Sequence, residues 1–125
     1  MVGTKPVVLI LGATGRTGSH LINLLEPECD RLELRVAIRK PEQADQFSKR
    51  GMITVPLDLD DLSTYEAALK GVQRLFMITG YTVDMMNQGK NLTDVAKDAR
   101  VEYIVHVGTF HQPGRPQSKL IRHYI

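Results

Sequence analysis

A glycine-rich turn near the N-terminus contains the residues best suited to bind a charged ligand. Residues 11–18 read Leu-Gly-Ala-Thr-Gly-Arg-Thr-Gly, directly after an apolar run and at the start of a predicted helix. Glycine tolerates the backbone angles of a tight turn and lets the main chain approach a pyrophosphate, while a helix N-terminus directs N–H groups at it. This context predicts a dinucleotide-binding turn; the alternative is a glycine turn that binds nothing. The predicted contacts are Gly12, Ala13, Thr14, Gly15, Arg16, Thr17 and Gly18.

Two cations follow the second predicted strand, at residues 34–38. Enzymes that bind NAD usually have an acidic residue here for the ribose hydroxyls, whereas a nearby arginine accommodates the 2′-phosphate of NADP. The sequence has Arg39 and Lys40 at this point and no carboxylate. It therefore predicts NADP as the cofactor, with NAD as the alternative. In the competing interpretation, the two cations are solvated and bind no ligand.

A third candidate segment follows the predicted strand at residues 52–57. Ligands of open parallel sheets lie across the carboxyl ends of the strands, so we expect Asp58 and the backbone of Leu59 to meet the adenine edge. Asp58 is also placed to cap the next helix, a role that Asp60 or Asp61 can fill instead. By the same geometry, the loops after the fourth and fifth strands should flank the nicotinamide. Those loops contain Thr79, Gly80, Gly108 and Thr109.

Alternating apolar runs and helical patterns predict the elements that position these segments. Predicted strands cover residues 7–11, 34–38, 52–57, 75–78 and 103–107. Predicted helices cover residues 17–26, 41–50, 63–70, 83–99 and 118–125, the third with Ser63 and Glu66 spaced as in a capping box. The alternation predicts an α/β fold, a Rossmann-type doubly wound parallel sheet of about five strands. Since the strands are continuous apolar runs, we expect helices to cover both faces of the sheet.

The composition of the 125-residue chain excludes several other classes of protein. Its net charge is +2, without the clustered basic face that nucleic-acid binding needs. It has no apolar stretch of the roughly 18 residues that would span a membrane, and no signal peptide. Its single cysteine, Cys29, excludes an internal disulfide and a multi-cysteine metal site. We therefore expect one cytoplasmic NAD(P)-binding domain over residues 1–125, without a metal and without direct contact to nucleic acid or membrane.

Four motifs, in this order, resemble the NmrA-like branch of the atypical short-chain dehydrogenase/reductases. They are Gly-Ala-Thr-Gly-Arg-Thr-Gly at 12–18, Arg-Lys-Pro at 39–41, Asp-Leu-Asp-Asp at 58–61 and Ala-Ala-Leu-Lys-Gly-Val at 67–72. The resemblance implies a Rossmann-type fold, NAD(P) binding and, in many members, hydride transfer from NADPH to a small electrophile such as a quinone or enone. Other members of this branch are regulators, so the alternative is a non-catalytic NAD(P) redox sensor that binds a protein partner.

The chain departs from the wider family in its catalytic motif and in its length. Short-chain dehydrogenases typically have Tyr-x-x-x-Lys after the fifth strand, but the residue four positions before Lys119 is Arg115. Lys119 resembles the catalytic lysine of isoflavone-reductase-like members only in a shifted register, and His111 is a further pocket candidate, so no catalytic residue is predicted. Family members also continue into a C-terminal substrate lobe. Because the chain stops inside a predicted helix, we expect a truncated product or fragment, with a naturally minimal domain as the alternative.

Overall fold

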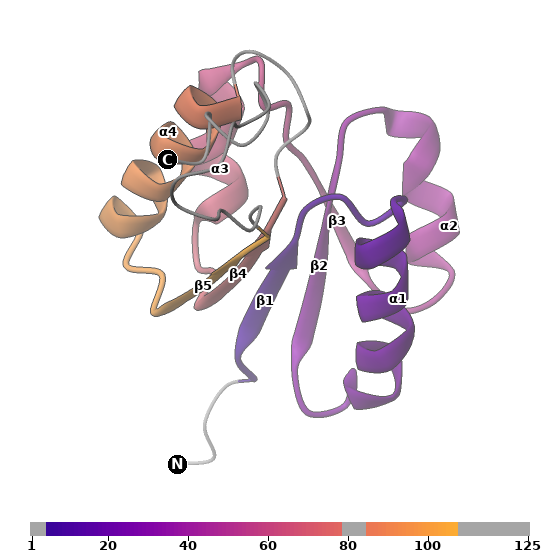
Figure 1. The fold of residues 1–125 in the computed structure, drawn as a ribbon. Helices are drawn as coiled ribbons and strands as arrows, with labels where there is room; N and C mark the ends of the chain where they lie inside the picture. The colour runs from indigo at the N-terminus through magenta and orange to yellow at the C-terminus, as the bar shows by residue number, and fades with distance from the viewer. Residues whose placement is uncertain (1–4, 79–84, 108–125) are drawn as a thin grey trace, which may run out of the picture.

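The five predicted strands form one parallel sheet. The computed structural model describes residues 5–78 and 85–107. The strands are β1 (Val7–Ile10), β2 (Glu33–Ile38), β3 (Ile53–Pro56), β4 (Arg74–Met77) and β5 (Tyr103–His106). They lie in the order β3-β2-β1-β4-β5, and all neighbouring pairs are parallel (Figure 1). The prediction of a Rossmann-type doubly wound sheet is therefore confirmed, with each strand end within one residue of its predicted position.

Helices lie on both faces of this sheet, as expected. They are α1 (Arg16–Leu25), α2 (Ala44–Ser48), α3 (Tyr65–Leu69) and α4 (Met85–Asp98). Figure 1 shows α1 and α2 on one face and α3 and α4 on the other. Two of these helices are shorter than predicted, because 3₁₀ turns at Pro41–Gln43 and Leu62–Thr64 replace their first turns. The predicted helix at 118–125 lies outside the described residues.

The central strand β1 contributes to two hydrophobic cores, one on each face of the sheet. Leu9 has no exposed surface and packs in the cluster beneath α3 and α4, together with Leu69, Leu75 and Leu92. The next residue, Ile10, points to the opposite face and is equally buried in the cluster beneath α1 and α2. This alternation follows from the two-residue period of a strand, and it requires apolar residues at consecutive positions.

The edge strand β5 is the most exposed of the five strands within the described residues. Tyr103 and Val105 remain 63% and 59% exposed, although their apolar run resembles those of the buried strands. Among the described elements, β5 pairs with β4 alone and so has a neighbour on one side only. The guanidinium of Arg74 lies 5.3 Å from the centroid of the Tyr103 ring and covers part of it. Helices nevertheless lie on both faces of the sheet, as the sequence predicts (Figure 1). Across the two described ranges, no helix combines the length and apolarity needed to cross a bilayer.

Candidate functional site

A cavity of about 290 Å³ lies at the carboxyl ends of β1, β2 and β3. The chain runs outward from β1 to β3 and then crosses back to β4, so the cavity lies near the point where the strand order reverses. In open α/β sheets this is where ligands bind. The residues that line it are Leu11, Gly12, Ala13, Thr14, Ala37, Ile38, Arg39, Gln43, Phe47, Leu57, Asp58, Leu59, Asp60, Ile78 and Gln88. All three predicted binding segments therefore contribute to one cavity.

The glycine turn connects β1 to α1 through a backbone arrangement that needs glycine. Gly12 has a φ of +70°, a conformation that side chains disfavour. Its carbonyl accepts a hydrogen bond from the N–H of Gly15 at 3.0 Å, which closes the turn. No side chain caps α1 at Gly15, and the first turn of the helix contains no acidic residue. The positive end of the helix dipole is therefore not offset by a local carboxylate.

Gly18 allows the first turn of α1 to pack directly on the glycine turn. A Cβ atom at this position would overlap with the carbonyl oxygen of Gly12 and would lie 2.6 Å from the carbonyl carbon. It would also lie 3.0 Å from the Cα atom of Ala13. Both neighbours are backbone and cannot rotate away, so only glycine fits between the helix and the turn.

The seven predicted residues of the glycine turn occupy different positions relative to the cavity. Gly12, Ala13 and Thr14 line it. Arg16 and Thr17 are exposed in the first turn of α1, and Gly18 is buried behind the turn. The predicted contacts therefore divide into residues at the cavity wall and residues that support or flank it.

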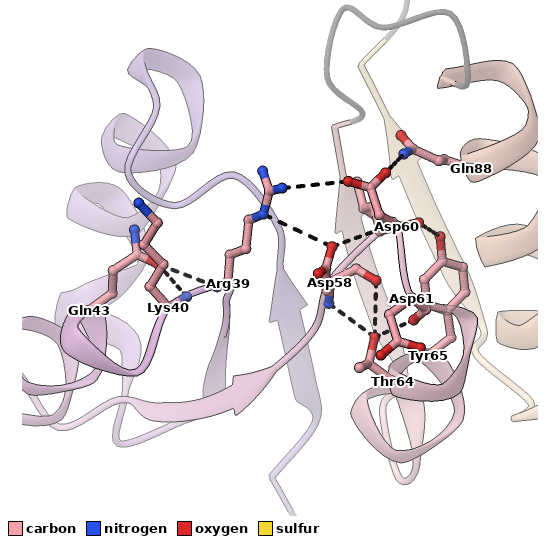
Figure 2. Close-up of polar contacts among 10 residues, drawn as sticks. Arg39, Lys40, Gln43, Asp58, Asp60, Asp61, Thr64, Tyr65 and Gln88 are labelled. Carbon is pink, nitrogen blue, oxygen red and sulfur yellow. Dashed lines mark hydrogen bonds and ion pairs between the residues drawn. The ribbon is translucent and has the colours of Figure 1, made fainter.

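Arg39 extends across the cavity toward two carboxylates. Its Nε atom lies 4.0 Å from Oδ1 of Asp58, and its Nη2 atom lies 3.5 Å from Oδ2 of Asp60 (Figure 2). We call these three residues the charged rim. The Arg39 side chain is 68% exposed, so solvent screens both ion pairs.

Lys40 is not among the residues that line the cavity. Figure 2 shows its side chain on the side of Gln43, away from the two carboxylates of the charged rim. The backbone N–H groups of Arg39 and Lys40 both donate to Oε1 of Gln43, each at 3.3 Å. Gln43 therefore fixes the loop after β2, while the role predicted for Lys40 remains a prediction.

One of the three acidic residues in the loop after β3 caps the turn that follows. Asp61 accepts hydrogen bonds from the N–H and the hydroxyl of Ser63 and so caps the 3₁₀ turn. The capping box expected from Ser63 and Glu66 is wrong, because Ser63 lies inside that turn. Asp58 does not cap it: its Oδ1 atom accepts from the N–H of Asp60 at 2.9 Å, within the loop.

Tyr65 supports this loop from below and was not among the predicted site residues. It has no exposed surface, and its hydroxyl donates to the carbonyl of Leu59 at 2.6 Å. Burial, together with the negative charges of Asp60 and Asp58, raises the pKa of the Tyr65 hydroxyl above its usual value. The carbonyl of Leu59 is thus already engaged. A lone tyrosine at a helix start gives no sequence signal for such a contact.

Gln88 is a second residue that the sequence reasoning missed. It lies in α4, is only 8% exposed, and donates from Nε2 to Oδ1 of Asp60 at 2.8 Å (Figure 2). A signal was present, since Gln88 is four residues before the buried Leu92 and interrupts the apolar face of the helix. A buried polar side chain requires a partner, and here the partner is a carboxylate of the charged rim.

Several predicted residues fall outside the part of the chain that the structure describes. They are Thr79, Gly80, Gly108, Thr109, His111 and Lys119. Within residues 5–78 and 85–107, no three histidine, cysteine or acidic side chains are grouped to hold a metal ion.

Several known proteins with similar sequences or folds are described as NAD(P)H-dependent reductases. The fold resembles triphenylmethane reductase of Citrobacter sp. in complex with NADP(H), with a TM-score of 0.81 and 23% identity over 94% of this chain and 42% of that one. It also resembles the NADPH complex of quinone oxidoreductase QOR2 from Escherichia coli, with a TM-score of 0.80 and 26% identity. That match covers 94% of this chain and 41% of the QOR2 chain.

Sequence comparison agrees with the structural comparison. An NAD(P)H azoreductase from Xenophilus azovorans is 31% identical over 99 residues, which cover 79% of this chain and 34% of the azoreductase. The chain thus spans about a third to two fifths of the length of these relatives. The profile of the NmrA-like family matches residues 4–124, nearly the whole sequence. The chain therefore belongs to the NmrA-like family.

Proposed function

We propose that this chain binds NADP(H) across the carboxyl ends of β1, β2 and β3. The observation that carries the proposal is that one cavity contains both the glycine turn and Arg39. An uncapped helix N-terminus suits a pyrophosphate, and a guanidinium suits the 2′-phosphate, because it forms two parallel hydrogen bonds to phosphate oxygens. We further propose that the bound dihydronicotinamide transfers hydride to a small electrophile such as a quinone or enone.

The cavity also contains a surface suited to the adenine ring. Ile38, Phe47 and Leu57 give it an apolar wall, and Asp58 stands at its mouth. A carboxylate at this point can accept a hydrogen bond from the exocyclic amino group of adenine. The backbone of Leu59 contributes through its N–H rather than its carbonyl, since Tyr65 already donates to that carbonyl.

The charged rim would have to rearrange when the nucleotide binds. Exposed ion pairs contribute only about 0–1 kcal/mol, so Arg39 can leave Asp58 and Asp60 at little cost. A phosphate dianion offers the guanidinium a charge-assisted, two-point contact in exchange. Arg39 is therefore suited to bind the 2′-phosphate, even though it faces two carboxylates when no nucleotide is bound.

No lysine, tyrosine or histidine is among the residues that line the described cavity. This part of the chain thus offers no evident proton donor, and its residues serve to hold and orient the cofactor. The observation is compatible with a reductase whose reacting groups lie elsewhere. It equally supports a dinucleotide sensor without catalysis. The test below distinguishes the sensor from the reductase.

Titration with NADPH and NADH, followed by nucleotide fluorescence, tests the proposal. We expect saturable binding of both nucleotides, with the lower Kd for NADPH. Failure to bind either nucleotide would contradict the proposed function. Quinone, enone and dye acceptors added to the NADPH complex separate the two activities: oxidation of NADPH supports the reductase, whereas tight binding without oxidation supports the sensor.

A further inference from the structure

We propose that Asp60 is a specificity-determining residue that lowers the preference of this site for NADP(H) over NAD(H). The inference rests on the proposed nucleotide site. Its basis is the contact between Asp60 and Arg39, the residue that distinguishes the two cofactors. Asp60 would compete with the 2′-phosphate for the guanidinium, and in the NAD(H) complex it would accept a hydrogen bond from the ribose.

The charged rim combines features of both cofactor classes. The sequence has no carboxylate at the end of β2, where NAD-binding enzymes usually have one. The loop after β3 nevertheless brings a carboxylate to the tip of the Arg39 side chain, because Oδ2 of Asp60 lies 3.5 Å from Nη2 of Arg39. Both residues line the same cavity. A cation for the 2′-phosphate and an acceptor for a ribose hydroxyl therefore stand side by side.

Two hydrogen bonds hold Asp60 in this position. Its Oδ1 atom accepts from the buried amide of Gln88 at 2.8 Å, which leaves Oδ2 directed at Arg39. Its backbone N–H donates to Oδ1 of Asp58 at 2.9 Å, which fixes the loop. Gln88 is thus a positioning residue, since its hydrogen bond holds the exposed Asp60 carboxylate toward Arg39.

The charge of Asp60 acts in opposite directions on the two cofactors. With NADP(H), Arg39 must leave Asp60, and the carboxylate then stands near a phosphate of the same sign. With NAD(H), no phosphate is present, and the same carboxylate accepts from the 2′-hydroxyl. Removing the charge should therefore tighten NADPH binding and weaken NADH binding.

The test compares Asp60→Asn with Asp61→Asn in the 125-residue chain. Both variants remove one negative charge from the same loop, but Asp61 contacts Ser63 rather than Arg39. Asparagine caps helices about as well as aspartate, so the control should remain folded. Fluorescence titration with NADPH and NADH gives the ratio of the two Kd values, and circular dichroism reports the fold of each variant.

We expect Asp60→Asn to raise the ratio of the NADH Kd to the NADPH Kd by about fivefold, the effect of one exposed charge pair. Asp61→Asn should change the ratio by less than about twofold, because its charge is farther from the rim and screened. Asp60→Glu, which retains the charge, should stay near the wild-type ratio. If Asp60→Asn leaves the ratio of Kd values unchanged, the inference is overturned while nucleotide binding stands. The same holds if Asp61→Asn changes the ratio as much as Asp60→Asn does. If the wild type binds neither nucleotide, the proposed function fails and the inference with it.

Discussion

The glycine turn and the charged rim line the same cavity but are held by different forces. The turn depends on backbone shape: Gly12 has a positive φ, and Gly18 packs against main-chain atoms. The rim depends on the charges of Arg39, Asp58 and Asp60, whose side chains are between 41% and 68% exposed. Steric fit to backbone cannot be relaxed by side-chain motion, whereas solvent screens exposed charges.

This difference indicates how the two parts of the site would respond to a ligand. In the proposed complex the turn would receive a phosphate without moving, because its hydrogen bond and its glycines fix the backbone. The rim must exchange partners, and the weakness of its ion pairs makes that exchange easy. Substitutions should therefore affect folding at the turn and nucleotide selectivity at the rim, a separation that the following predictions test.

Gly18→Ala should have the largest effect. The new Cβ atom would overlap with the carbonyl of Gly12 and force α1 away from the turn. We expect the free energy of unfolding to fall by about 3 kcal/mol, the upper range for overpacking, and nucleotide binding to be lost. Urea denaturation followed by circular dichroism measures the change.

The matched control for this variant is Thr17→Ala, one residue earlier in the same helix. Thr17 is exposed, and alanine favours helix formation, so its stability should change by less than about 0.5 kcal/mol. If Gly18→Ala is as stable as Thr17→Ala, the steric account of the turn is wrong.

Arg39→Ala should act on cofactor selectivity. We expect NADPH to bind about tenfold more weakly, because the contact to the 2′-phosphate is lost, and NADH affinity to change by about twofold or less. Stability should change by less than about 1 kcal/mol, since both ion pairs of Arg39 are exposed. Equal losses for the two nucleotides would refute the assignment of Arg39 to the 2′-phosphate.

Tyr65→Phe tests the support beneath the rim. The carbonyl of Leu59 would lose its donor, so we expect a loss of about 1 kcal/mol of stability at neutral pH. The raised pKa of Tyr65 means that the unfolded chain releases this proton first, so folding stability decreases as the pH rises above about 10. Phenylalanine removes this contribution, and the alkaline decline should become shallower.

Urea denaturation at a series of pH values between neutral and alkaline provides the measurement. Tyr103→Phe is the control, because the Tyr103 side chain is exposed on β5 and its ring is retained. Its stability at neutral pH should change by less than about 0.5 kcal/mol. An alkaline decline in Tyr65→Phe as steep as in the wild type would show that Tyr65 does not contribute to it.

Lys40→Ala should have the smallest effect, and it provides the charge control for Arg39→Ala. Lys40 lies outside the cavity lining, so only a screened, longer-range attraction to the 2′-phosphate is lost. We expect NADPH affinity to fall by about twofold or less. A loss as large as that of Arg39→Ala would mean that Lys40 binds the phosphate directly in the complex.

Local patterns in the sequence were sufficient to predict the strands. Apolar runs bounded by glycine, proline and polar residues placed all five within one residue of their observed ends. The helix boundaries were harder, because Pro41 and Leu62 begin 3₁₀ turns that a helical period does not distinguish from α-helix. The exposure of β5 among the described residues was also not predictable, since an apolar run indicates a strand but not its place at the edge of the sheet.

The order of short motifs along the chain thus predicted the parallel sheet and the glycine turn. The strands and the turn depend on backbone conformation and on residues close in sequence, and the strand–helix alternation indicates parallel pairing. The environment of Arg39 was not encoded in this way. Asp60 is 21 residues from Arg39, and Gln88 is 28 residues from Asp60. Contacts between side chains of separate strands and helices form only when the sheet assembles, so the folded chain alone brings a competing carboxylate to the cation.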